Sequence, residues 1–146
     1  MKKSAPLFIV AATLLTACPG VFKDSVAPSK PVLGLSKFTS TPIKDIRTAA
    51  APISVASGET FRAIITNIAD NVGVTSARIV KVAGQTREEV IKAATKGPAV
   101  EFDLKYDCPA GSPAEVTVSY AAQVFDADQN TAESDVQDVT VTCSAK

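Results

Sequence analysis

Residues 100–106, Val-Glu-Phe-Asp-Leu-Lys-Tyr, alternate apolar and charged side chains without interruption. Successive side chains of a β-strand point to opposite faces, so this alternation predicts a strand with one buried and one solvated face. The same pattern returns in residues 116–124 and again in residues 138–143. Three one-sided strands in the C-terminal third of the chain favour a sheet whose apolar face needs cover from a second layer.

Weaker strand patterns precede these three. Residues 60–67 place three apolar side chains on one face, and residues 74–82 are less clearly one-sided. Clusters of Gly, Pro, Asn and Asp separate the segments and predict turns. Residues 87–95 fit either a short helix or a connecting strand. About six strands without convincing helices therefore predict an all-β, antiparallel β-sandwich over residues 53–146.

The N-terminal residues 1–17 have the pattern of an export signal. Lys2 and Lys3 precede an apolar run of 11 residues that ends at Ala17, and Cys18 follows directly. A helix that crosses a bilayer needs about 20 apolar residues. We therefore expect this segment to be removed after export rather than retained as a membrane span.

The end of this segment, Leu15-Thr16-Ala17-Cys18, resembles the lipobox of bacterial lipoproteins. The resemblance implies lipid attachment to the Cys18 thiol and cleavage just before it, with membrane lipid as a partner. Two or more acyl chains bind firmly, because each buried methylene contributes about 0.8 kcal/mol. Pro19 stands where an Asp would signal inner-membrane retention, which favours the outer membrane or cell surface of the envelope. The alternative is an ordinary signal peptide that happens to precede a cysteine.

Residues 18–52 are punctuated by prolines and show no sustained apolar period. Proline lacks a backbone donor and fixes an extended backbone, so this composition predicts a lipidated, semi-stiff tether. A first strand at residues 32–38 is the alternative interpretation.

Two stretches resemble the bacterial immunoglobulin-like modules of surface proteins. The first is DNVGVTSARI at residues 70–79, and the second is YAAQVFDADQNTA at residues 120–132. The resemblance implies an immunoglobulin-like sandwich over roughly residues 53–144. Gln129 stands where the family usually has glycine, so a left-handed backbone at this position would cost about 1 kcal/mol.

The remaining cysteines, Cys108 and Cys143, suit a disulfide. Cys108 precedes the penultimate predicted strand and Cys143 ends the last one, so a hairpin brings both to one end of the sandwich. An exported protein meets the oxidising conditions in which such bonds persist. Two free thiols in a metal or redox site are the alternative, but the chain has no CxxC spacing and no histidine.

Composition weighs against several function classes. Histidine, the commonest general base near neutral pH, is absent. Loss of Lys2 and Lys3 leaves 13 basic against 15 acidic residues. A mildly acidic protein is poorly suited to bind nucleic acid, whose phosphates are neutralised by Lys and Arg side chains. Glu88 and Glu89 are adjacent and point to different faces, unlike the opposed carboxylates of a glycosidase. We therefore expect a protein that is not an enzyme.

Four oxygen-bearing residues suggest a cation site. Asp70, Asp126, Asp128 and Asn130 occupy predicted turns at the end of the sandwich where the tether arrives. Such hard oxygen donors suit calcium, although the EF-hand pattern fails because its sixth position would be Thr131 instead of glycine. A cadherin-like calcium site between loops and tether is one hypothesis. The other is that these side chains cap local backbone donors in their turns.

Taken together, these features predict a lipid-anchored envelope or surface protein with a non-catalytic binding or structural module. Its expected partner is another envelope or surface protein, through adhesion or subunit contacts. A calcium-dependent spacer or adhesion module is the first alternative. An accessory carbohydrate-binding module is a weaker one, because the chain has two Tyr and no Trp to form an aromatic platform.

Overall fold

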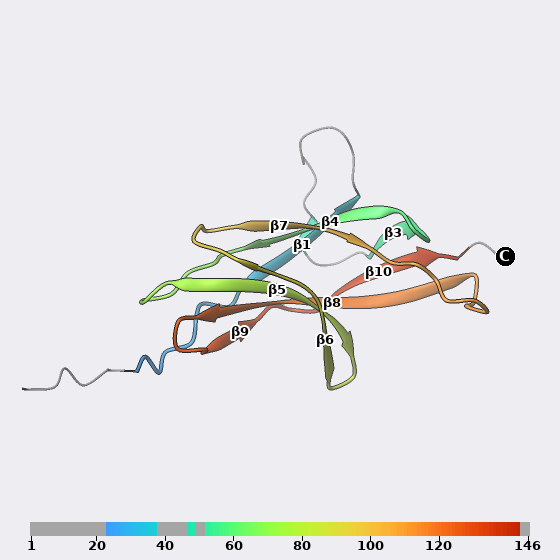
Figure 1. The fold of residues 1–146 in the computed structure, drawn as a ribbon. Helices are drawn as coiled ribbons and strands as arrows, with labels where there is room; N and C mark the ends of the chain where they lie inside the picture. The colour runs from blue at the N-terminus through green and yellow to red at the C-terminus, as the bar shows by residue number, and fades with distance from the viewer. Residues whose placement is uncertain (1–22, 38–46, 49–51, 144–146) are drawn as a thin grey trace, which may run out of the picture.

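The computed structural model describes residues 23–37, 47–48 and 52–143, which form two packed β-sheets (Figure 1). The first sheet has the strand order β2 (Arg47–Thr48), β1 (Val32–Lys37), β4 (Thr60–Thr66), β7 (Val100–Lys105). The second has the order β3 (Ile53–Ala56), β10 (Gln137–Thr142), β8 (Glu115–Asp126), β5 (Val74–Ala83), β6 (Thr86–Ala94), with β9 (Thr131–Glu133) also paired to β8. The prediction of an all-β sandwich is confirmed. No helix among the described residues is long and apolar enough to cross a membrane.

The core lies between the two sheets and is built from the alternating positions. Phe102 and Leu104 of β7 are buried, whereas their charged neighbours on the strand are exposed. Phe61 of the first sheet packs on Tyr120 of the second, with ring centroids 5.8 Å apart. The alternation identified in the sequence therefore decides which side chains meet in the core.

Among the described residues, all strand pairs are antiparallel except one, in which β3 runs parallel to β10. The first strands of the chain are divided between the layers, because β1 lies in the first sheet and β3 lies in the second. Strands next to each other in sequence repeatedly lie in opposite sheets, as with β4 and β5 or β7 and β8. Such crossings tie the two layers together.

The predicted boundary of the folded module at residue 53 is wrong. β1 pairs with β4 over six residue pairs, and Leu33 and Leu35 are buried in the core. The prolines that suggested a tether flank this strand, since Pro31 precedes it and no proline lies within it. The alternative interpretation of residues 32–38 as a strand is therefore the better one over residues 32–37.

Residues 87–95, for which the sequence left two conformations open, contribute to β6. In the part of the chain that the structure describes, this edge strand pairs only with β5, and eight of its nine residues are exposed. A strand solvated on both faces has no apolar alternation, so periodicity could not identify it. A register shift opposite Ile79 and Val80 marks a bulge at Val90.

The long strand β8 joins the two ends of the sandwich (Figure 1). At the end where β8 begins, Cys108 and Cys143 form a disulfide, with Cα atoms 5.8 Å apart. We call this end the disulfide pole. The opposite end consists of the connections 67–73 and 126–130 and of the segment 23–31, and we call it the aspartate pole.

Candidate metal centre

Asp126 ends β8 and is the fully buried member of the site. Its carboxylate accepts hydrogen bonds from the backbone N–H of Asn130 at 2.8 Å and from the Asn130 side-chain amide at 2.7 Å. These two bonds close the turn between β8 and β9. Gln129 in this turn has φ = 67°, the left-handed conformation in which glycine is favoured.

Asp70 is held by a local turn of the kind that Asp side chains form with their own backbone. One of its carboxylate oxygens accepts from the backbone N–H groups of Val72 and Gly73, at 3.0 and 3.1 Å. Gly73 has φ = 95°, which a residue with a side chain rarely adopts. The second oxygen of Asp70 takes no part in this turn and lies 3.0 Å from the side-chain amide of Asn71.

Asp24 comes from the segment 23–31, far away in sequence. Its backbone N–H donates to the Asp128 carboxylate at 2.6 Å, and its carbonyl oxygen accepts from the Asn130 side chain at 2.9 Å. The turn 126–130 thus fixes the backbone of Asp24. This leaves the Asp24 carboxylate pointing towards Asp70.

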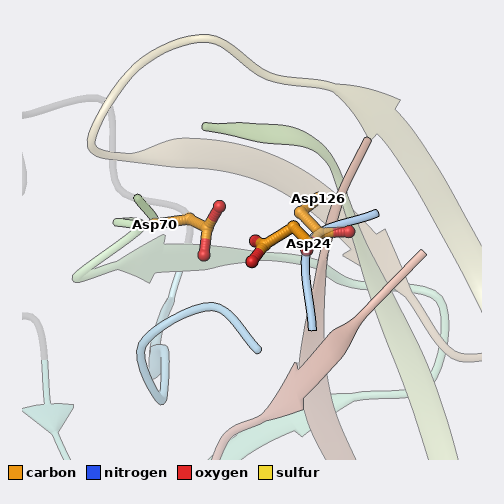
Figure 2. A group of neighbouring side chains, drawn as sticks. All are labelled: Asp24, Asp70 and Asp126. Carbon is orange, nitrogen blue, oxygen red and sulfur yellow. The ribbon is translucent and has the colours of Figure 1, made fainter. Parts of the chain in front are cut away.

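The three aspartates converge, as Figure 2 shows. One carboxylate oxygen from each of Asp24, Asp70 and Asp126 lies within 4.8 Å of the other two. Three negative charges so close together repel one another unless cations or hydrogen-bond donors lie nearby. The group therefore has the charge and the oxygen ligands that a hard divalent cation prefers.

Asn71 bears on how well this group suits a cation. Its side-chain amide lies against both half-buried members, 3.0 Å from an oxygen of Asp70 and 3.2 Å from an oxygen of Asp24. With its nitrogen towards them, the amide donates to both carboxylates. With its oxygen towards them, it would add a fourth oxygen ligand, of the six to eight that calcium takes. By rotating its amide group, Asn71 can therefore suit the site either without a cation, as a hydrogen-bond donor, or with one, as an oxygen ligand.

The sequence-based ligand set is only partly brought together. Asp70 and Asp126 lie in the convergent group, but Asp128 does not, because its carboxylate binds the Asp24 backbone instead. Asn130 likewise positions Asp24 and Asp126 through its amide. Asp24 was not predicted as a ligand, since nothing in the proline-punctuated N-terminal region indicates that it docks beside residues 70 and 126.

Other predicted features also have definite places. The disulfide between Cys108 and Cys143 is present, as predicted. Glu88 pairs with Lys81 and Glu89 with Arg78, so the two adjacent carboxylates have separate partners. Cys18 lies outside the described residues.

A scan against protein-family models and a search of curated proteins found no match, so the chain is assigned to no family on that basis.

Proposed function

We propose that this protein is a lipid-anchored component of the bacterial cell envelope whose sandwich binds another envelope or surface protein without catalysis. The observation that carries this proposal is the Cys108–Cys143 disulfide. Disulfides persist in exported proteins and are rare in the reducing cytosol. The bond also uses two of the three cysteines and leaves Cys18, the residue at the lipobox-like motif, for acylation.

We further propose that the sandwich is immunoglobulin-like. The strand distribution supports this: β1, β4 and β7 share one sheet, while β5, β8 and β10 share the other. Immunoglobulin-type sandwiches divide strands A, B and E from strands C, F and G in the same way. Domains of this architecture commonly serve as recognition modules, although fold alone does not assign a partner.

Intact-mass analysis tests the anchoring. The full-length gene is expressed in a bacterial host, and the protein is extracted from the membrane fraction. We expect a chain that begins at Cys18 and carries acyl groups, and we expect Cys18→Ser to leave the membrane fraction. Cys108→Ser is the matched control, because it removes a cysteine without touching the motif and should stay in the membrane fraction. An uncleaved, unacylated chain would end the proposal.

A second candidate function is a calcium-dependent spacer or adhesion module. The convergence of Asp24, Asp70 and Asp126 favours it, because a cation there would join the N-terminal segment to two turns of the sandwich. Binding to the folded state alone raises stability by mass action, so calcium should raise the melting temperature. The alternative, in which the aspartates only cap local backbone groups, predicts no such rise.

Calorimetric titration and thermal unfolding with calcium distinguish these two readings. We expect heat of binding and an increased melting temperature at millimolar calcium, both strongly reduced in Asp70→Asn and Asp24→Asn. Asp107→Asn serves as the control, because Asp107 is exposed and pairs with Lys105 away from the aspartate pole. Absence of heat and of stabilisation in the unmodified protein would exclude calcium binding here.

A further inference from the structure

Residues 23–31, the docked segment, follow a fixed path along the aspartate pole. Besides the two backbone contacts of Asp24, the Ser29 N–H donates to the Ala69 carbonyl at 2.8 Å. The Lys30 carbonyl accepts from the Asn67 side chain, also at 2.8 Å. Pro28 and Pro31 are buried. The chain is therefore part of the folded module from Asp24 onwards, well before the first strand.

This path shortens the connection to the proposed anchor. Only five residue steps separate Cys18 from Lys23. A fully extended chain spans at most about 3.6 Å per residue, so Lys23 lies within about 18 Å of the Cys18 Cα atom. A tether of that length cannot hold the sandwich far from the bilayer, contrary to the long tether that the prolines suggested.

The two poles are farther apart than this connection can reach. β8 runs from one pole to the other over 12 residues, which at a rise of about 3.3 Å per residue corresponds to roughly 36 Å. An anchor at Cys18 therefore keeps the aspartate pole beside the membrane in every orientation. The disulfide pole is the end that is free to extend outwards.

The surface of the aspartate pole also suits lipid headgroups. Val26 and Val72 are 56% and 54% exposed. The Val26 N–H donates to the Asp24 carboxylate, and the Val72 N–H donates to the Asp70 carboxylate, so both valines belong to the aspartate pole. Exposed valines gain from partial burial at a headgroup boundary. Lys23, exposed on the same segment, has the charge that attracts phosphate. The neighbouring carboxylates oppose this attraction, so the short connection provides the main constraint.

We infer that the aspartate pole is a membrane-facing surface, with Val26 and Val72 at the headgroups of the bilayer that holds Cys18, and that the disulfide pole points away. This inference rests on the proposed acylation of Cys18. It commits to a phospholipid surface as the partner of this pole. Contacts with another protein are then confined to the disulfide pole and to the sheet faces.

Energy transfer to lipid headgroups tests the orientation. An azide-bearing residue is introduced at Val72 or, in a second variant, at the exposed Ala110 of the disulfide pole, and is coupled to a donor fluorophore. The acylated protein is then reconstituted into phosphatidylcholine–phosphatidylglycerol vesicles that contain acceptor-labelled headgroups. We expect several-fold faster transfer from position 72 than from position 110. A Gly/Ser insertion of about 20 residues after Gly20 adds on the order of 25 Å and should largely remove the difference.

Intact mass, measured on the same preparation, separates the two possible failures. An acylated protein with equal transfer from both positions, or with faster transfer from position 110, would overturn the orientation alone. An unacylated protein would overturn the proposed anchoring and the orientation with it. A difference that survives the insertion would show that the connection does not set the orientation, and would also overturn the inference.

Discussion

At the scale of single residues, Gln129 has the backbone conformation least suited to its side chain. Its φ of 67° places it in the left-handed region, where a Cβ atom is strained. Asn67 has a similar φ of 58°, but asparagine tolerates this region better and its side chain binds the Lys30 carbonyl. Gln129 has no comparable compensation from its residue type.

We therefore predict that Gln129→Gly stabilises the protein. Relief of the left-handed strain should contribute up to about 1 kcal/mol, partly offset by the greater freedom of glycine in the unfolded chain. Urea denaturation of the two proteins measures the difference. Gln129→Ala keeps the Cβ atom and should remain close to the unmodified protein, and a glycine variant that is less stable than the alanine variant would contradict the prediction.

At the scale of elements, β6 and β9 are joined across the two strands between them. Arg87 of β6 donates to the carboxylate of Glu133 on β9 at 2.9 Å, and the Gln123 side chain donates to the same carboxylate. The Arg87 guanidinium, followed by the Gln123 amide, lowers the pKa of Glu133, although partial burial opposes this effect. The pairing thus links the exposed edge strand β6 to β9 by side chains as well as through the backbone pairing of the sheet.

The lowered pKa of Glu133 makes the contribution of the Arg87–Glu133 ion pair to stability sensitive to acid. A carboxylate with a depressed folded-state pKa contributes stability that is present above its ordinary value, about 4.3, and is lost as the pH falls through the lower folded-state value. We predict that Glu133→Gln loses less stability than the unmodified protein between about pH 5 and pH 3. Denaturation at both pH values measures this, with Glu88→Gln, whose ion pair is more exposed, as the comparison. Equal acid losses in Glu133→Gln and the unmodified protein would refute the role of this pair.

The strands differ in how far the sequence could predict them, and the difference has a physical cause. β7 and β10 each have one buried face, so their alternation was visible in residues 100–106 and 138–143. In β8 the apolar side chains alternate over residues 116–124, although residues 120–124 are buried on both faces. β6 is solvated on both faces and gave no period. β1 is as long as β7 and β10, but it is preceded by a proline and buries three consecutive residues, so it shows no alternation. Its burial depends on pairing with a distant strand.

The candidate site shows the same limit. Asp70 and Asp126 were predicted because turn-forming sequence surrounds them, and the predicted hairpin order places both turns at one end. Asp24 could not be predicted, because its position depends on long-range contacts with Asp128 and Asn130. Local patterns therefore identified two of the three convergent carboxylates, and only the docking of the N-terminal segment supplied the third.

At the scale of the whole molecule, the disulfide joins the two ends of a long chain segment. The register of β8 and β10 pairs Glu115 with Thr142, which brings Cys143 beside the chain that leads from Cys108. The cysteines are 35 residues apart in sequence, so in the chain-entropy model the bond contributes roughly 4 kcal/mol. This is a large share of the net stability of a small domain.

We predict that Cys108→Ala/Cys143→Ala unfolds at a clearly lower urea concentration, with a loss of about 2–5 kcal/mol. Reduction of the unmodified protein with dithiothreitol should reproduce most of this change, which controls for the loss of the two sulfur atoms from the packing. A double variant with the unmodified midpoint would mean that the cross-link restricts the unfolded chain little.

The pairing of β1 with β4 has a mechanical consequence for a protein held at its N-terminal end. β1 begins at the aspartate pole, where the docked segment leads into it, and runs beside β4 over six residue pairs. A pull on the N-terminus, resisted by a partner at the far end, acts along the length of β1 and slides it past β4. The interstrand hydrogen bonds then share the load and must yield together, whereas a pull at right angles would open them one after another. We therefore expect the sandwich to resist a pull between the anchored N-terminus and the disulfide pole better than a pull across its strands.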